Sequence, residues 1–265
     1  PKEALMKYVE RLLPSIRLTL GGHPDGILQG VDMIVLSPGV PPDIAPLKKA
    51  REMGIRIIGE LELAYQIIHS QSPMPFLAIT GTNGKSTTTT LLNEMLNKGG
   101  FRTIIGGNIG NALTEELNKL KAKSEKLKVD FIVAEVSSFQ LEAIETFRPA
   151  GAAILNITPD HMDRYHSMEN YNDAKARIFA NQGKGDYLVL NADDRETMKV
   201  ESEKLKVKNE RPEAFYFSRK KAVEGVYFKD GVIYSNFNSS LLTLKSQLLR
   251  ADEINIKGVH NLENA

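Results

Sequence analysis

A glycine-rich turn followed at once by a lysine and a serine is the segment of this sequence best suited to chemistry. The apolar run over 76–80 leads into Gly81-Thr82-Asn83-Gly84, and Lys85-Ser86-Thr87 then opens a helical stretch that runs to Lys98. Glycines let backbone N–H groups point into one concavity, and a helix N-terminus adds partial positive charge there. Lys85 can reach terminal phosphates, and the Ser86 hydroxyl can bind Mg²⁺. The turn therefore predicts a nucleotide-phosphate site.

The predicted phosphate loop departs from the general pattern at one position. That pattern has a glycine five residues before Gly84, where this sequence has Ile79. An ordinary strand, turn and helix with an incidental Lys-Ser pair is therefore the alternative. The apolar strand before the turn and the helical spacing after it favour phosphate binding.

Charged side chains follow two further predicted strands. The strand over 131–134 ends in Glu135, and the strand over 152–157 leads into a segment with two carboxylates, the His161 imidazole and Arg164. Ligands of open α/β sheets bind at the carboxyl ends of the strands. We therefore predict that Glu135 holds the Mg²⁺ of the nucleotide and that His161 contacts a metal or a substrate. A solvated Glu135 and a structural His161 are the alternatives.

A second glycine-rich turn, Gly106-Gly107-Asn108-Ile109-Gly110, follows a short strand predicted over 102–105. By itself this turn is a weak signal, because Gly-Gly-Asn is simply a good turn sequence. Beside the first loop, its backbone and the Asn108 amide could donate hydrogen bonds to a second ligand.

Strands alternate with helices along most of the chain, which predicts an α/β fold with mostly parallel sheets. Residues 1–74 are predicted to form a partial Rossmann-like domain without the usual first strand and glycine-rich loop. Residues 75–265 are predicted to form a central domain of the P-loop ATPase type. The polar segment 71–75, interrupted by two prolines, is the predicted linker. The charge-rich segments 119–128 and 199–211 are predicted to be solvated.

The composition is that of an ordinary globular protein. The 265 residues carry 34 Lys+Arg against 33 Asp+Glu, and none is Cys. This charge balance gives no reason to expect a nucleic-acid or membrane-surface partner, and the lack of Cys excludes disulfides and thiolate zinc sites. No apolar run approaches the roughly 18 residues that span a bilayer. We expect a cytoplasmic protein that is a monomer.

Taken together, the motifs resemble the Mur ligase family, ATP-dependent enzymes of peptidoglycan precursor synthesis, whose phosphate loop also lacks the outer glycine. The segments Phe139–Glu142 and His161–Tyr165 are most similar to the members that join D-glutamate to UDP-N-acetylmuramoyl-L-alanine. The matching segments are Thr80–Thr87, Gly106–Gly110, Glu135–Glu142, Asn156–Tyr165, Asn191–Asp194 and Gly258–Ala265.

The resemblance implies an ATP site with two Mg²⁺ ions, in which Lys85, His161 and Lys175 are catalytic. Lys85 would contact the terminal phosphates, and Ser86 and Glu135 would bind one Mg²⁺. His161 would act at the second Mg²⁺ together with Lys175, which the family carries as a carbamate. Carbamylation turns a cation into an anionic oxygen ligand, which suits a hard metal. From the residue spacing alone, Lys175 would instead be a solvent-facing lysine.

The resemblance also implies the substrates. ATP would phosphorylate the L-alanine carboxylate of UDP-N-acetylmuramoyl-L-alanine, and the amine of D-glutamate would attack the resulting acyl phosphate. Two sets of residues would contact these ligands: Gly39, Asn108, Ser138 and His161 at the UDP-linked substrate, and Asn261 and Asn264 at the adenine.

Family members carry a further, C-terminal domain. We therefore expect a fragment that lacks the start of the N-terminal domain and the whole C-terminal domain, and that does not ligate by itself. Three alternatives stay open: a sibling Mur or folylpolyglutamate-type ligase, a P-loop phosphotransferase, and a non-catalytic nucleotide-binding module. The first would share the ATP site and differ in its amino acid. The second would release phosphate independently of D-glutamate.

Overall fold

The structure is a computed structural model that describes residues 16–71, 73–122, 129–206, 209–238 and 243–254. Its contacts divide the chain into two compact units. The smaller unit contains the described residues up to Ile34 together with Pro41–Ile57, and the larger unit contains Val35–Val40 and the residues from Ile58 onward.

The first elements among the described residues are short. Strands β1 (Met33–Leu36) and β2 (Arg56–Gly59) form a two-stranded sheet. Helix α2 (Ala45–Glu52) lies between them in the chain and buries Leu47 and Ala50. The predicted order of strand, helix and strand is therefore confirmed here.

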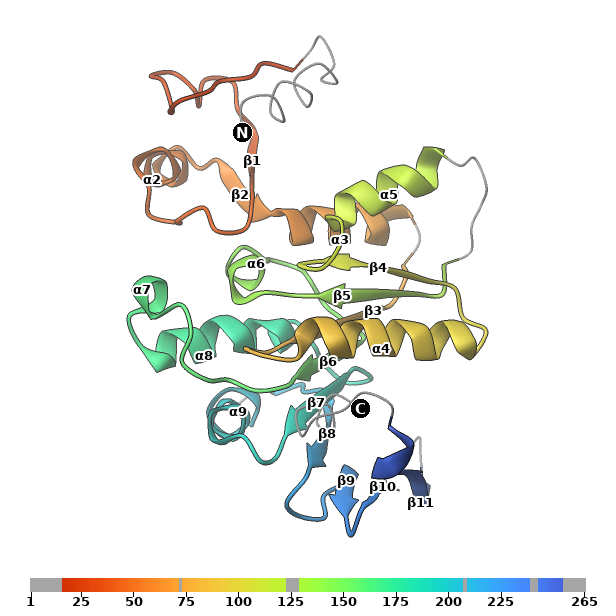
Figure 1. Cartoon of the computed structure of the whole chain (residues 1–265). Coiled ribbons are helices and arrows are strands. Elements are labelled where there is room, and N and C mark those ends of the chain that lie inside the picture. The colour runs from red at the N-terminus through yellow and green to blue at the C-terminus, as the bar shows by residue number, and fades with distance from the viewer. Residues whose placement is uncertain (1–15, 72, 123–128, 207–208, 239–242, 255–265) are drawn as a thin grey trace. The chain divides into compact units, whose positions relative to one another are not determined.

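The larger unit is built on one nine-stranded sheet with the order β11-β10-β9-β8-β7-β6-β3-β5-β4 (Figure 1). Neighbouring strands from β4 to β9 run parallel, and β9, β10 and β11 are antiparallel to one another in turn. This sheet confirms the predicted α/β class. The strands are β3 (Phe76–Thr80), β4 (Thr103–Gly107), β5 (Phe131–Glu135), β6 (Gly151–Ile154), β7 (Tyr187–Asn191), β8 (Glu213–Ser218), β9 (Gly225–Lys229), β10 (Val232–Asn238) and β11 (Thr243–Arg250).

Helices flank this sheet. In the view of Figure 1, α4 runs along the front of the central strands, and it contacts β3, β4 and β5. Helix α3 contacts α5 and α6, and α8 contacts α6, α7 and α9. The helices of the larger unit are α3 (Glu60–Gln71), α4 (Lys85–Lys98), α5 (Leu113–Ala122), α6 (Ser138–Glu142), α7 (Met162–Tyr165), α8 (Met168–Ala176) and α9 (Arg195–Val200), with shorter 3-10 or π turns at Arg177–Phe179, Glu201–Leu205 and Ala251–Glu253.

Helix α3 packs into the core of the larger unit. The rings of Tyr65, Phe76 and Phe147 meet edge to face, with centroid distances of 5.4 to 5.6 Å. Such aromatic contacts join α3 to β3 and to the segment before β6. The structure therefore groups residues 58–71 with the larger unit, and the expected domain boundary after residue 74 stays a prediction.

The charge-rich segment 199–211 is not wholly solvated as predicted. Glu201 is 7% exposed and accepts a hydrogen bond from the Tyr216 hydroxyl, and Leu205 is 3% exposed. Tertiary packing on β8 outweighs the local charge pattern here. Asp230 (φ 49°) and Gly231 (φ 80°) form the tight turn of a hairpin between β9 and β10.

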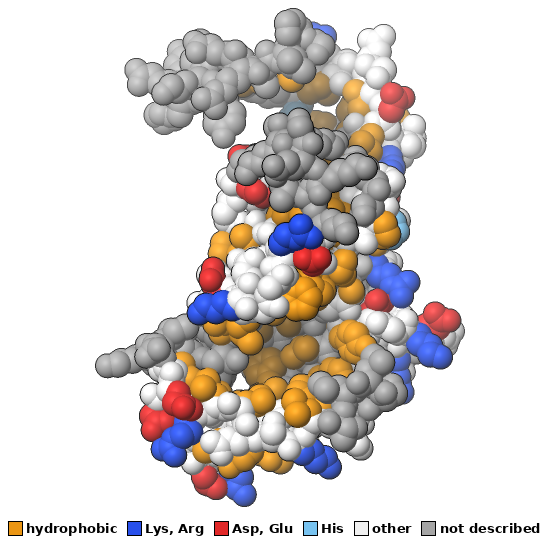
Figure 2. Space-filling view, turned by 90° about the vertical axis from the view of Figure 1, so that its right-hand side faces the viewer, with side chains coloured by type: hydrophobic (Ala, Val, Ile, Leu, Met, Phe, Trp, Pro, Cys, Tyr) orange, Lys and Arg blue, Asp and Glu red, His pale blue; other side chains and the backbone are white. Residues whose placement is uncertain are grey.

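Apolar side chains also reach the surface of the larger unit. Figure 2 shows hydrophobic side chains around a hollow in the lower part of that view. Exposed apolar residues in this unit include Val189 on β7 and Leu248 on β11. Among the described residues, no helix has both the length and the apolar character needed to cross a bilayer.

Candidate active site

The loop between β3 and α4 has the geometry of a phosphate-binding turn. Strand β3 is mostly buried, and its last residue, Thr80, has no exposed surface. The chain then turns through Gly81 to Gly84, which has φ 82°, before α4 begins at Lys85. A Cβ on Gly81 would lie 3.1 Å from the Leu155 Cβ, so a larger residue would push the loop away from the neighbouring chain. Helix α4 therefore begins directly after the loop.

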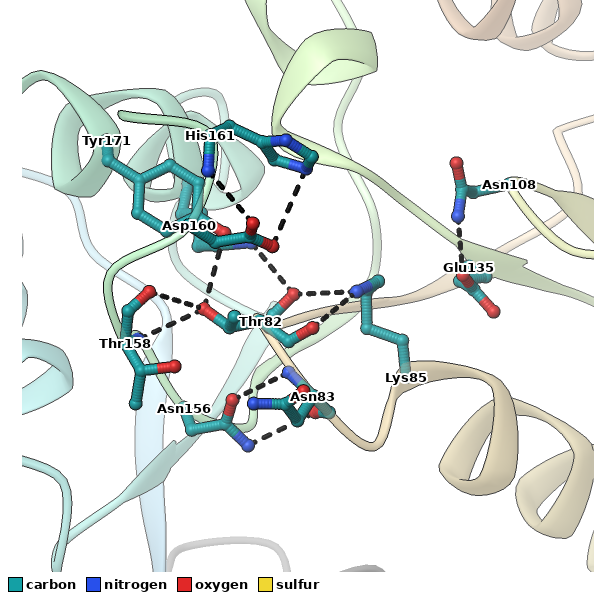
Figure 3. Close-up of polar contacts among 12 residues, drawn as sticks. Thr82, Asn83, Lys85, Asn108, Glu135, Asn156, Thr158, Asp160, His161 and Tyr171 are labelled. Carbon is teal, nitrogen blue, oxygen red and sulfur yellow. Dashed lines mark hydrogen bonds and ion pairs between the residues drawn. The ribbon is translucent and has the colours of Figure 1, made fainter. Parts of the chain in front are cut away.

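Hydrogen bonds tie this loop to the segment that follows β6 (Figure 3). The Asn83 N–H donates to Asn156 Oδ1 at 2.8 Å, and Asn156 Nδ2 donates to the Asn83 carbonyl at 3.1 Å. The Thr82 hydroxyl accepts from the Thr158 N–H at 3.0 Å and lies 3.3 Å from the Tyr171 hydroxyl. These contacts hold the loop against the carboxyl end of β6.

Two lysines meet at one carbonyl oxygen of the loop. Lys85 Nζ donates to the carbonyls of Gly81 at 3.0 Å and Thr82 at 2.9 Å. Lys175 Nζ, from α8, donates to the same Gly81 oxygen at 2.8 Å. The structure thus brings together Lys85 and Lys175, which are 90 positions apart in the sequence.

Lys175 is not the solvent-facing lysine that its spacing alone suggested. Only 1% of it is exposed, and its Nζ lies 4.7 Å from the centre of the Tyr171 ring. Burial, and then the charge of Lys85, lower the pKa of the Lys175 amine to about 7, although Asp160 raises it. The amine is therefore largely uncharged just above neutral pH.

Glu135 ends β5 with one free carboxylate oxygen. Asn108 Nδ2 donates to its Oε1 at 2.7 Å, whereas its Oε2 is buried and has no hydrogen-bond partner among the described residues. A buried carboxylate oxygen without a donor fits a cation, because oxygen is the preferred ligand of Mg²⁺. Gly107 lets β4 lie close to the end of β5. It has φ 104°, and a Cβ there would lie 2.4 Å from the Glu135 carbonyl oxygen.

His161 has an unusual backbone at the start of α7. Its φ is 53°, a left-handed conformation that is uncommon outside glycine. Its N–H donates to Asp160 Oδ1 at 2.9 Å, and its Nε2 lies 3.6 Å from Asp160 Oδ2. Its ring contacts Phe139 at 4.8 Å between centroids, and 46% of its side chain is exposed. The imidazole can therefore meet a ligand from outside.

Helix α6 starts two residues after β5. Ser137 caps it, with the Gln140 N–H donating to the Ser137 hydroxyl and the Ser137 N–H donating to Gln140 Oε1. Ser138, a predicted substrate residue, is 3% exposed. At the other end of α6, Glu142 forms an ion pair with Arg164, whose guanidinium lies over the Phe139 ring.

Two other predicted site residues are exposed, and two lie outside the described residues. Ser86 is exposed in the first turn of α4, and Gly39 is exposed with φ 91°. The Gly39 carbonyl accepts from Arg164 at 3.4 Å, within the larger unit. Asn261 and Asn264 are outside the described residues. Over the described part of the chain, no three His, Asp or Glu side chains are grouped as a ready metal site.

A family model named the Mur ligase middle domain matches residues 79–265. The chain belongs to the Mur ligase family. This finding confirms the resemblance that the motifs indicated.

Curated Mur ligases resemble the chain over nearly its whole length. A protein named UDP-N-acetylmuramoylalanine--D-glutamate ligase from Pelotomaculum thermopropionicum is 45% identical over 94% of this chain and 51% of its own length. One with the same name from Thermoanaerobacter pseudethanolicus is 46% identical over 95% of this chain and 51% of its own. The chain thus spans about half the length of the curated relatives that it matches.

Solved Mur ligases share the fold. The structure of UDP-N-acetylmuramoyl-L-alanyl-D-glutamate--2,6-diaminopimelate ligase matches with a TM-score of 0.57 and 20% identity, over 88% of this chain and 54% of that one. The ligase called MPL from Neisseria meningitides matches with a TM-score of 0.55 and 16% identity, over 88% and 71%. At these identities the likeness shows the Mur ligase fold alone.

Sequence reasoning did not assign a site role to three residues that hold the loop between β3 and α4. Asn156, Thr158 and Tyr171 hold the loop through side-chain or backbone hydrogen bonds. Asn156 lies near the end of the strand predicted over 152–157 and Thr158 follows it, so the rule that ligands gather at strand ends could have found them. Tyr171 had no comparable signal, because its approach to Thr82 depends on how α8 packs.

Proposed function

We propose that this chain supplies the ATP site of an amide ligase that adds D-glutamate to UDP-N-acetylmuramoyl-L-alanine in peptidoglycan precursor synthesis. Membership of the Mur ligase family and relatives of that name at 43–46% identity support the proposal. The observation that carries it is the meeting of the Lys85 and Lys175 side chains at the Gly81 carbonyl, which puts two amino groups on the loop between β3 and α4.

The first step is phosphoryl transfer. The carboxylate of the UDP-linked L-alanine attacks the terminal phosphorus of ATP, the bond to the ADP oxygen breaks, and an acyl phosphate forms. Backbone N–H groups of the loop bind the phosphates, and Lys85 turns from the loop carbonyls toward the terminal phosphate, where it offsets negative charge. The N-terminus of α4 adds to this positive potential.

Bound Mg²⁺ would neutralise negative charge on the phosphates while the terminal phosphoryl group is transferred. The free Glu135 Oε2 is the carboxylate oxygen best suited to hold one such ion, with the Ser86 hydroxyl on the same ion. His161 and Lys175 would serve a second. Asn108 orients Glu135 through the hydrogen bond to its other oxygen.

Lys175 suits a carbamate better than an ammonium. Its amine is buried and shares an acceptor with Lys85, and no carboxylate among the described residues accepts a hydrogen bond from it. An amine with a pKa near 7 attacks CO₂ readily, forming an N–C bond and releasing one proton. The product is an anion beside Lys85, so the repulsion between two cations becomes an attraction.

The second step joins the amino acid. The amine of D-glutamate attacks the carbonyl carbon of the acyl phosphate, loses a proton, and expels phosphate from the tetrahedral intermediate. Ser138 and Asn108, on segments next to Glu135, are the residues we assign to the UDP-linked substrate. We assign the exposed His161 imidazole to the reacting carboxylate, because it belongs to the segment whose Thr158 N–H donates to the loop.

Substrate dependence of ADP formation tests this function. With the full-length natural protein that carries this sequence, we expect repeated turnover only when ATP, Mg²⁺, UDP-N-acetylmuramoyl-L-alanine and D-glutamate are all present. The product mass should rise by one glutamate residue. Turnover without D-glutamate would instead indicate a phosphotransferase, and turnover with another amino acid or acceptor would indicate a sibling ligase.

A further inference from the structure

The first turn of α3 contains a fully buried carboxylate that the proposed mechanism does not use. Glu62 has no exposed surface, yet it carries five hydrogen bonds. The backbone N–H groups of Glu145, Thr146 and Phe147 donate to it at 2.9 to 3.0 Å, and the Thr146 hydroxyl and the Gln66 amide donate as well. Burial of a carboxylate is tolerated only when it is paired in this way.

Neighbouring residues of the same turn hold further segments. The Gly59 N–H donates to the Ala143 carbonyl at 2.8 Å, and a Cβ on Gly59 would lie 3.1 Å from the Ala143 Cβ. Glu60 Oε1 accepts from the Thr114 N–H, in the first turn of α5, at 2.8 Å. We call residues 59–62 the α3 turn.

The two segments that the α3 turn holds lead directly to the residues assigned to the UDP-linked substrate. Segment 143–147 follows α6, whose first residue is Ser138. Helix α5 follows the loop that contains Asn108. The chain enters the larger unit at Ile58, immediately before this turn.

We propose that Glu62, assisted by Glu60, is a positioning residue for the acceptor side of the site. This inference rests on the proposed function. Neither carboxylate contacts substrate. Glu62 fixes segment 143–147 and with it α6 and Ser138, and Glu60 fixes the start of α5 and with it the Asn108 loop. The α3 turn thereby sets the spacing of two substrate residues that lie on different segments.

A carboxylate is required at position 62 because both of its oxygens accept. Glu145 and Phe147 donate to Oε2, while Thr146 donates to Oε1. In Glu62→Gln the side chain is isosteric but has only one accepting oxygen. If the NH₂ group takes the place of Oε2, it faces the N–H groups of Glu145 and Phe147. If it takes the place of Oε1, it faces the donors of Thr146. Two buried donors would then lack a partner, and segment 143–147 would shift or open.

Two measurements on Glu62→Gln test the proposal, with Glu94→Gln, an exposed glutamate of α4, as the matched control. In the unliganded chain, amide hydrogen exchange over 137–147 should become at least about tenfold faster, while α4 keeps its wild-type rates. In the full-length protein, the KM for UDP-N-acetylmuramoyl-L-alanine should rise about tenfold with the KM for ATP within about twofold. The control should match the wild type in both measurements.

Glu60→Gln provides a milder second variant in case Glu62→Gln does not fold. It should speed exchange over 106–114 and raise the acceptor KM about threefold without changing the ATP KM. Equal rises in both KM values, uniformly faster exchange, or a lower melting temperature with unchanged KM values would overturn the proposal. If the wild-type protein does not use this acceptor at all, the proposed function fails, whereas the exchange measurement still tests whether the α3 turn holds the two segments.

Discussion

Lys85 and Lys175 donate hydrogen bonds to the same carbonyl oxygen, that of Gly81, at 3.0 and 2.8 Å. Burial of Lys175, and then the charge of Lys85, lower the pKa of the Lys175 amine to about 7. The loop therefore holds one buried amine that loses its proton much more easily than an ordinary lysine does. Such an amine suits the carbamylation that we propose for Lys175.

Removing Lys85 should raise the pKa of Lys175. Burial is the larger cause of the low value and remains in Lys85→Met, but the repulsion between the two amines disappears. An NMR titration of the Lys175 Nζ should detect the upward shift, and Lys98→Met, at the exposed end of α4, should leave the pKa near 7. An unchanged or lower pKa in Lys85→Met would show that the two amines are not coupled. The same variant should also abolish ATP turnover.

The stability of the unmodified chain should depend on pH through Lys175. The pKa of Lys175 is about 7 when folded and 10.5 as the ordinary value, so between these pH values the unfolded chain binds one more proton than the folded chain. In CO₂-free buffer, stability should therefore rise from about pH 7 to pH 10, by up to about 1.4 kcal/mol per pH unit. Lys175→Met should lack this rise in stability with pH, and Lys98→Met should keep it. Urea unfolding at each pH measures the free energy of unfolding. Equal slopes in all three proteins would contradict the burial of a titrating amine.

Glu62 should contribute to stability above acid pH. Burial alone would raise the pKa of its carboxyl group, but the hydrogen bonds from Thr146, Glu145 and Gln66 together hold that pKa below the usual value. A folded-state pKa below the unfolded one stabilises the protein above the unfolded pKa, and this contribution is lost as the pH falls through the folded value. Between about pH 5 and pH 3, Glu62→Gln should lose less stability than Glu94→Gln. If Glu62→Gln lost more stability than Glu94→Gln as the pH falls, the carboxyl pKa of Glu62 would not be lowered by folding.

Gly107 should be required for the position of Glu135. A Cβ at Gly107 would lie 2.4 Å from the Glu135 carbonyl oxygen, whereas at Gly110, which also has a positive φ, nothing lies within 4 Å. Gly107→Ala should therefore cost more than about 2 kcal/mol and weaken Mg²⁺-dependent ATP binding, while Gly110→Ala should cost only about 1 kcal/mol. Thermal unfolding and calorimetric titration with Mg²⁺-ATP measure both effects. Similar losses in the two variants would contradict the close approach.

Local patterns predicted the elements that carry the phosphate loop. The strand over 76–80, the helix over 85–98 and the strand ending at Glu135 have the bounds expected from the sequence. Long apolar or periodic runs fix such elements, because they must bury one face wherever the chain folds. The loop between them could be predicted from its glycines and from its position between a strand and a helix.

The features missed by sequence reasoning depend on contacts between distant segments. Helices α6 and α7 have five and four residues, too few for a periodic pattern to show. Glu62 looks like any helical glutamate, and its burial follows from amides 83 to 85 positions away. Lys175 likewise looks exposed by spacing, and only the packing of α8 against the loop buries it.

The central claim is that ATP activates the acceptor as an acyl phosphate at the Lys85 loop, and oxygen-isotope transfer tests it most directly. UDP-N-acetylmuramoyl-L-alanine labelled with ¹⁸O in its carboxylate is turned over with Mg²⁺-ATP and D-glutamate by the full-length protein. Because the attacking carboxylate oxygen leaves with phosphorus, the account predicts one ¹⁸O in each phosphate released, as measured by mass spectrometry. Unlabelled phosphate, released while amide is formed, would contradict it.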